Sequence, residues 1–397
     1  MRTNNNKLLL ISLSIFFTFI AKGQTSDSIP NKRPIHQVEF DIAPGYIFLS
    51  NDFYKGNNLK KEKIDKSLSL HLKYAFQFNP NSYLGKLYPH TYQGVGIAYN
   101  TFYNSNEVGN PIALYVFQGS RIKQLSQHLS FDYEWNFGAS FGWKPYDENK
   151  NEYNTSIGSR INAYINLGFF LNWQMTSQWK LAAGVTATHY SNGNTHYPNG
   201  GLNTTGMRIG VTRLFDARYN KISMQHETMR IPLVKPHLSY DVIIYGATRS
   251  KGIVDEHYIV PSSFGIVGFN INPLYRFNKY LKAGLSLDGQ YDESAHIENH
   301  IAGKNENGDM RFYRPPFIER IEAGLSLRGE FVMPIFSINI GIGHNILYKG
   351  SGYGGFYQVV ALKTSITRNL FLHVGYQLSK FHDPKNLMLG FGYRLNN

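Results

Sequence analysis

Apolar and polar residues alternate along most of this chain. In the run HLSFDYEWNFGASFGWK (128–144), the odd-numbered positions from Leu129 to Trp143 are apolar and the even-numbered positions are polar or small. A period of two residues indicates a β-strand with one apolar face. The run is long for a strand of a soluble protein, and aromatic residues recur on its apolar face. Both features are typical of transmembrane barrels, whose apolar side chains face lipid.

The same alternation returns in about sixteen runs along the chain. Because strands in lipid satisfy their backbone hydrogen bonds only in a closed barrel, these runs must close on one another. The predicted fold class is therefore all-β, a transmembrane antiparallel β-barrel. Further examples of the pattern are SLSLHLKYAFQF (67–78), RINAYINLGFFLNW (160–173), YLKAGLSLDGQY (280–291) and RIEAGLSLRGEFVM (320–333).

The order of the runs favours two tandem eight-stranded barrels, and one barrel of 14–16 strands is the alternative. The eighth run, TGMRIGVTRLF (205–215), resembles the last run of the chain, LMLGFGYRL (387–395). The polar stretch between the two halves is far longer than a periplasmic turn. We therefore predict four segments: a signal peptide (1–23), an eight-stranded barrel with the active site (24–215), a linker (216–235), and a second, non-catalytic barrel half (236–397).

The N-terminus predicts export. Lys7 precedes the apolar run LLLISLSIFFTFIA, and AKG supplies a small residue just before Gln24. A positive start, a short apolar segment and a small-residue cleavage site are the features of a secretory signal peptide. The apolar run is too short to span a bilayer comfortably, and no later stretch reaches the roughly 18 apolar residues of a spanning helix. We expect the mature chain in the outer membrane of a Gram-negative bacterium.

The composition excludes some kinds of chemistry but does not by itself identify a binding partner. The chain has no cysteine, which excludes disulfides, cysteine-ligated zinc and a thiol nucleophile. Its formal net charge of +13 suits nucleic acid, anionic lipid or lipopolysaccharide. Export and the lack of a nucleic-acid motif argue against nucleic acid. We expect no metal or other cofactor, and the oligomeric state stays open.

The stretch THYSNGNTHYPNGGLN (188–203) joins two alternating runs and carries the candidate chemistry. In the first run, the odd-numbered residues from Trp179 onward form the lipid-facing set, so His189 and Ser191 share that face. Asn203 has the parity of the outward residues of the next run. Three polar side chains on a lipid face are costly unless they serve a function. We therefore expect a site on the outer wall, near the extracellular rim, that meets lipid of the outer leaflet.

These residue types suit ester hydrolysis by a serine. A serine and a histidine two residues apart on one strand face can come within hydrogen-bonding distance. The imidazole of His189 can then take the hydroxyl proton, which makes Ser191 a nucleophile. A third group must hold the imidazole in the correct tautomer, and Asn203 can do so through its amide oxygen.

The stretch HYSNGNTHYPNGGLN also resembles the H-x-S-N…P-N-x-G motif of the lipid A 3-O-deacylase family. Members of that family are eight-stranded outer-membrane barrels that hydrolyse an ester-linked acyl chain of lipid A. The resemblance implies that His189 is the general base, that Ser191 is the nucleophile, and that Asn192 and Asn199 stabilise the oxyanion. Where the family has a catalytic glutamate, twelve residues after the serine, this chain has Asn203.

The second half lacks the motif, because aligning the two halves places Lys380 and His382 over His189 and Ser191. The resemblance implies that lipid A, in lipopolysaccharide, is the substrate. Two other readings stay open. One is a non-enzymatic channel or structural barrel with a relic motif, and the other is a phospholipase-type esterase that uses the same residues.

Overall fold

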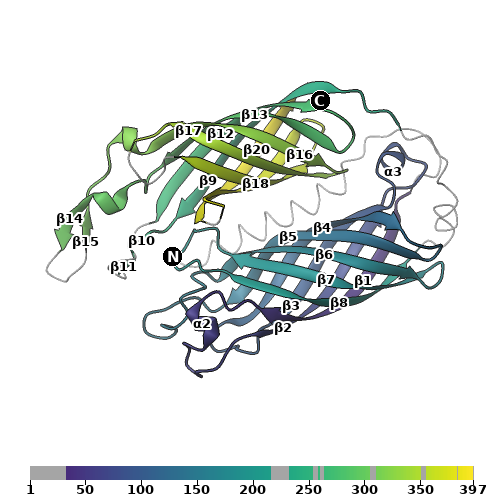
Figure 1. Cartoon of the computed structure of the whole chain (residues 1–397), viewed down its shortest axis with the longest axis horizontal. Coiled ribbons are helices and arrows are strands. Elements are labelled where there is room, and N and C mark those ends of the chain that lie inside the picture. The colour runs from purple at the N-terminus through teal and green to yellow at the C-terminus, as the bar shows by residue number, and fades with distance from the viewer. Residues whose placement is uncertain are drawn as a thin grey trace. The chain divides into compact units, whose positions relative to one another are not determined.

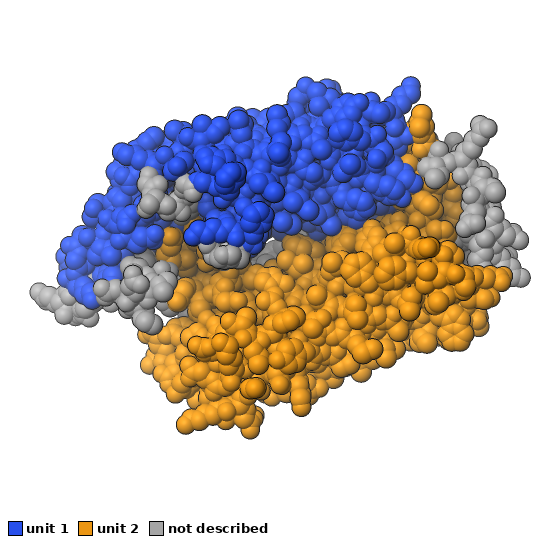
Figure 2. All heavy atoms as spheres, in the orientation of Figure 1, with its two compact units in different colours: residues 1–31, 234–248, 264–397 blue, residues 32–233, 249–263 orange. Residues whose placement is uncertain are grey.

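The computed structural model describes most of the chain after the N-terminal segment. The predicted signal peptide and residues 216–231 of the predicted linker lie outside the described residues. The chain divides into two compact units, which Figure 2 colours separately. The second half of the chain forms most of one unit, and the other unit contains the first half together with Arg249–Ser263. The described residues are 33–215, 232–253, 258–259, 263–304, 310–349, 355–381 and 383–396.

The first half forms a closed antiparallel barrel of eight strands in chain order (Figure 1). β1 closes the barrel by pairing with both β2 and β8. Two short helices lie in its connections, α2 (Asp52–Lys55) and α3 (Tyr83–Leu87). The strands are β1 (Ile35–Ile47), β2 (Lys66–Gln77), β3 (Thr91–Thr101), β4 (Gly109–Gln124), β5 (Leu129–Trp143), β6 (Ile161–Gln174), β7 (Trp179–Ser191) and β8 (Leu202–Leu214).

The second half forms another closed antiparallel barrel of eight strands. The prediction of two tandem eight-stranded barrels is therefore confirmed, and the alternative of a single barrel of 14–16 strands is wrong, because each sheet closes on itself. The barrel strands are β9 (His237–Arg249), β12 (Phe264–Arg276), β13 (Leu281–Asp292), β16 (Ile321–Val332), β17 (Phe336–Leu347), β18 (Phe356–Ser365), β19 (Leu370–Ser379) and β20 (Asp383–Leu395). Its connections add β10 (Gly252–Ile253), β11 (Tyr258–Ile259), β14 (Ile301–Lys304), β15 (Met310–Phe312) and two 3₁₀ turns, η2 (Ile297–Asn299) and η3 (Phe317–Glu319).

The alternation in the sequence corresponds to the two faces of each strand. In β6, Ile165 and Leu167 are 41% and 47% exposed, whereas Asn166 between them is 4% exposed. Apolar side chains thus cover the outer wall, whereas the interior holds polar and charged side chains together with a buried aromatic cluster that includes Phe117 and Tyr164. This distribution is the reverse of a soluble protein and suits a barrel whose outer wall faces lipid.

Four connections meet at one end of the first barrel and include the predicted site. They are residues 48–65, 102–108, 144–160 and 192–201, and we call this end of the first barrel the loop end. Two of the connections at the opposite end, 125–128 and 175–178, are tight turns. The third, residues 78–90, is longer and contains α3.

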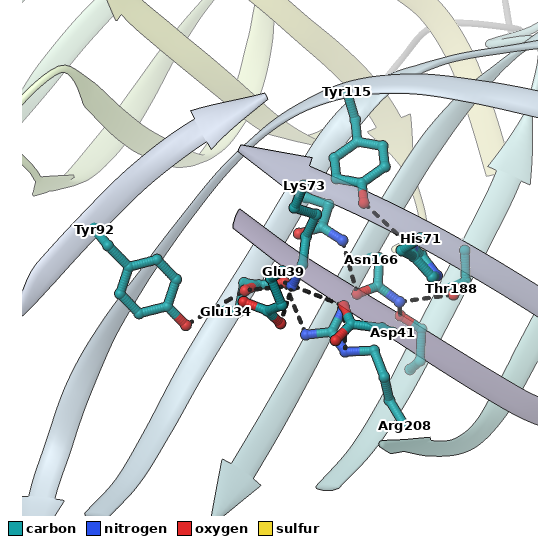
Figure 3. Close-up of polar contacts among 12 residues, drawn as sticks. Glu39, Asp41, His71, Lys73, Tyr92, Tyr115, Glu134, Asn166, Thr188 and Arg208 are labelled. Atoms are coloured by element: carbon teal, nitrogen blue, oxygen red, sulfur yellow. Dashed lines mark hydrogen bonds and ion pairs between the residues drawn. The ribbon is translucent and has the colours of Figure 1, made fainter. Parts of the chain in front are cut away.

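Buried ions fill part of the interior of the first barrel (Figure 3). Lys73 Nζ lies 2.6 Å from Glu39 Oε1, 2.9 Å from Asp41 Oδ2 and 3.1 Å from Glu134 Oε1. Arg208 Nη2 lies 2.7 Å from Glu134 Oε1. We call these five residues the charge cluster. Each of them is less than 10% exposed, so the two cations offset much of the charge of the three carboxylates inside the barrel.

The second barrel is filled in a similar way. Asp241 accepts from Arg394 Nε at 2.6 Å and from Lys363 Nζ at 2.8 Å, and Lys363 also contacts Glu330. Barrels of eight strands are just wide enough for side chains to fill their interiors, and both halves of this chain have that construction.

Candidate functional site

Strand pairing brings His189 and Asn203 together at the loop end. The two residues are direct partners in the β7–β8 register. His189 Nδ1 lies 2.6 Å from Asn203 Oδ1. Because an amide oxygen only accepts hydrogen bonds, this contact places the ring proton on Nδ1 and leaves Nε2 as the basic nitrogen. The arrangement is the one that a general base requires.

Ser191 ends β7, two residues after His189. Tyr190 between them is 1% exposed and points into the barrel, where its ring packs 5.0 Å from that of Trp143. This inward anchor directs the side chains of His189 and Ser191 to the outer face, as strand alternation requires. Ser191 is only 7% exposed. Because little water reaches this side chain, the local dielectric is lower than in bulk water and electrostatic interactions at the site are stronger.

Gly201 lies against both residues. A Cβ atom at this position would lie 3.4 Å from His189 Cε1 and 3.9 Å from Ser191 Cβ. The edge of the imidazole ring and the serine side chain are therefore both close to Gly201. The backbone of Gly201 has a φ of +69°, which favours glycine. Neither His189 nor Ser191, both within the described part of the chain, is hydrogen-bonded to the other. Such contacts are often formed only when substrate is bound.

Asn192 holds the loop between β7 and β8. Its Nδ2 donates to the backbone oxygens of His196 at 2.8 Å and Pro198 at 3.3 Å. Its backbone oxygen accepts from the Thr195 hydroxyl at 2.9 Å. The amide donors of Asn192 are therefore used within the loop itself.

Asn199 is oriented by its neighbour Asn192. The backbone N–H of Asn192 donates to Asn199 Oδ1 at 3.0 Å. This contact fixes which way the Asn199 amide points and turns its Nδ2 donor group to the other side. Asn199 also forms an isolated β-bridge with Ile157 from the connection between β5 and β6. Within the described part of the chain, Asn199 Nδ2 donates no hydrogen bond, whereas Asn192 Nδ2 is used within the loop.

His196 lies apart from this group. It is exposed, and its Nδ1 lies 3.2 Å from the Thr195 hydroxyl oxygen.

Two residues that hold the site were not singled out by any sequence pattern. Tyr54 and Ser156 bind the backbone of Gly201, although they precede it by 147 and 45 positions. An isolated tyrosine and an isolated serine in two polar loops carry no recognisable signal, and only the folded loops bring them together.

The second barrel has no equivalent loop at the aligned position. Ser379 of β19 pairs directly with Asp383 of β20, so a tight turn replaces the ten-residue connection of the first barrel. Lys380 lies in this turn, and His382, the position aligned with Ser191, lies outside the described residues.

No described helix is long and apolar enough to cross a bilayer. Within the same part of the chain, no group of three or more His, Asp or Glu side chains is arranged to hold a metal ion.

Two protein-family models match the chain, one in each barrel. The model described as lipid A 3-O-deacylase (PagL) matches residues 71–212, which include His189, Ser191 and Asn203. The model described as the C-terminal domain of acyloxyacyl hydrolase matches residues 238–397. No curated protein matches the chain.

Among solved structures, 178 chains match. One is the FrpB iron transporter of Neisseria meningitidis, at 12% identity and a TM-score of 0.22, covering 90% of this chain and 61% of its own. Another is a ferric enterobactin receptor (PfeA) mutant of Pseudomonas aeruginosa, at 9% identity and a TM-score of 0.25, covering 88% and 44%. The siderophore receptor PirA of Acinetobacter baumannii has 9% identity and a TM-score of 0.23, covering 89% and 68%. This chain thus spans less than two thirds of the first two, and likeness at this level carries no inference.

Proposed function

This chain belongs to the lipid A 3-O-deacylase family, and from that premise we propose that it is an outer-membrane serine esterase that removes an ester-linked acyl chain from lipid A. The observation that carries the proposal is the contact between His189 Nδ1 and Asn203 Oδ1, with Ser191 on the same face of β7. The family match supports the reaction class, and the geometry supports a role for each residue.

In the proposed mechanism, His189 Nε2 takes the proton of the Ser191 hydroxyl as Oγ attacks the ester carbonyl. The negative charge that develops on the carbonyl oxygen is stabilised by Asn199 Nδ2 or by nearby backbone N–H groups, while Asn192 keeps the loop in place. The tetrahedral intermediate then collapses and breaks the ester C–O bond, and the leaving alcohol oxygen of lipid A takes the proton from His189. Water, deprotonated by the same imidazole, releases the fatty acid from Ser191.

The surroundings of the site suit an acyl chain. On β6, Ile165 pairs with His189 and Ala163 pairs with Ser191. Below them the outer wall continues with Leu167 on β6 and Met207 on β8, which are 47% and 62% exposed. A lipid in the outer leaflet could therefore lie along the wall with its ester at Ser191, because apolar side chains cover the path of its chain.

The direct test is mass spectrometry of lipid A and phospholipids from cells with and without the chain. We expect lipid A to lose the mass of one acyl chain while the phospholipids stay intact. Cleaved phospholipids with intact lipid A would favour the phospholipase-type alternative. An unchanged acylation pattern under strong expression would contradict both.

Replacing Asn203 with glutamate should leave the rate equal or raise it. A carboxylate accepts from Nδ1 as the amide oxygen does, and its full charge stabilises the imidazolium that forms in the reaction. Asn203→Leu, which keeps the size but removes the acceptor, should lower kcat by about 10²-fold. Both can be measured as fatty acid released from lipopolysaccharide by purified protein. A slower Asn203→Glu would contradict the assigned role.

The channel alternative predicts ion flow through a barrel, and we expect none. Lys73 and Glu134 occupy the interior of the first barrel, and Lys363 and Asp241 that of the second, all less than 10% exposed. Planar-bilayer recordings of the full chain should show no steady conductance above that of the bare bilayer. A large and steady conductance would instead support the channel.

A further inference from the structure

We infer that Tyr54 and Ser156 are positioning residues for this hydrolysis, which hold Gly201 against the pair formed by His189 and Ser191. The inference rests on the proposed function and extends it to two side chains that lie in other loops of the loop end.

The two hydroxyls converge on one carbonyl. Tyr54 Oη donates to Ser156 Oγ at 2.9 Å and to the Gly201 oxygen at 3.3 Å. Ser156 Oγ donates to the same oxygen at 2.6 Å. In the other direction, the Gly201 N–H donates to the Ser156 backbone oxygen at 3.2 Å. Both backbone polar groups of Gly201 are therefore bound to this pair of residues.

Tyr54 and Ser156 are buried, and hydrogen bonds fix the backbone around them. Tyr54 is fully buried and Ser156 is 1% exposed. Asn154 Oδ1 accepts from the N–H groups of Ser156 and Ile157, at 3.3 and 3.0 Å. Asn51 caps α2, which carries Tyr54, by accepting from the Phe53 N–H at 2.9 Å. Burial raises the pKa of the Tyr54 hydroxyl, so this group stays protonated and can donate.

Gly201 connects this pair to the reacting groups. It stands immediately before β8, two residues ahead of Asn203, and it borders both His189 and Ser191. A shift of Gly201 would move the Asn203 oxygen away from His189 Nδ1 and would change the packing of the Gly201 backbone beside His189 and Ser191. Displacements of about 1 Å at such a distance from the reacting atoms can cost about 10²-fold in rate.

The test compares Tyr54→Phe and Ser156→Ala with wild type in the purified full-length chain, with lipopolysaccharide as the substrate. We expect each variant to lower kcat about 10-fold, with KM changed less than about 2-fold, because neither side chain touches substrate. The matched control is Tyr103→Phe, which removes a hydroxyl from a tyrosine of another loop that is 61% exposed. Its kcat should equal that of wild type.

A double-mutant cycle separates positioning from general stability. In an Asn203→Ala background the histidine has already lost its acceptor, so Tyr54→Phe should lower kcat less than about 2-fold. An undiminished 10-fold loss in that background would overturn the inference, as would a raised KM with unchanged kcat.

Hydrogen-exchange mass spectrometry gives a readout that does not need activity. Tyr54→Phe and Ser156→Ala should speed amide exchange in residues 192–203 and leave β4 and β5 unchanged. If these variants kept wild-type rates of both exchange and catalysis, the inference would be wrong, while the proposed function would still stand. If the wild-type chain released no fatty acid from lipopolysaccharide, both the proposed function and this inference would be wrong.

Discussion

Ser191→Ala is expected to lower the release of fatty acid from lipopolysaccharide by about 10⁴-fold or more, because removing the nucleophile removes the covalent route altogether. The residual rate would reflect binding and oxyanion stabilisation of a direct attack by water. The measurement is the initial rate with purified protein, together with trapping of an acyl group on Ser191 by mass spectrometry. Only the wild type should carry the acyl adduct.

Ser126→Ala is the matched control, since Ser126 lies exposed in the turn between β4 and β5. It should keep the wild-type rate. His189→Asn should resemble Ser191→Ala, and combining the two should cost little more than either alone, because the residues act as a unit. Full activity in Ser191→Ala would remove the nucleophile assignment, even if the chain remained an esterase.

The second large effect concerns stability. Lys73→Met should lower the free energy of unfolding by about 3–5 kcal/mol, because it leaves Glu39, Asp41 and Glu134 buried around an apolar side chain. Of the two cations in the charge cluster, Arg208 would remain to offset their charge. Urea unfolding in lipid vesicles, followed by tryptophan fluorescence, measures the change.

Lys123→Met is the control for this variant, since Lys123 is exposed near the end of β4. It should shift the free energy of unfolding by no more than about 0.5 kcal/mol. Adding Glu39→Gln to Lys73→Met should recover part of the loss, because one carboxylate fewer is left unpaired. Equal stability of Lys73→Met and Lys123→Met would show that the charge cluster is not needed to hold the barrel.

Much of the fold follows from the sequence because strand alternation is a local property of the backbone. The pattern around Asn166 indicates which side chains face lipid before any partner strand is known. The same reasoning places His189 and Ser191 on the outer wall, since they are near in sequence and share parity with Trp179. The closure of sixteen strands into two sheets, however, depends on which edge strands meet, as β1 meets β8.

For the candidate site, the sequence by itself determined the residue types and their side of the wall, and the tertiary structure decided their partners. The pairing of His189 with Asn203 depends on the β7–β8 register, which the turn between those strands sets. The hydrogen bonds from Tyr54 and Ser156 to Gly201 link three loops, and no periodic pattern in the sequence predicts that these loops meet. Alternation is fixed within each strand, but contacts between loops exist only after distant strands have closed the barrel and brought its loops to one end.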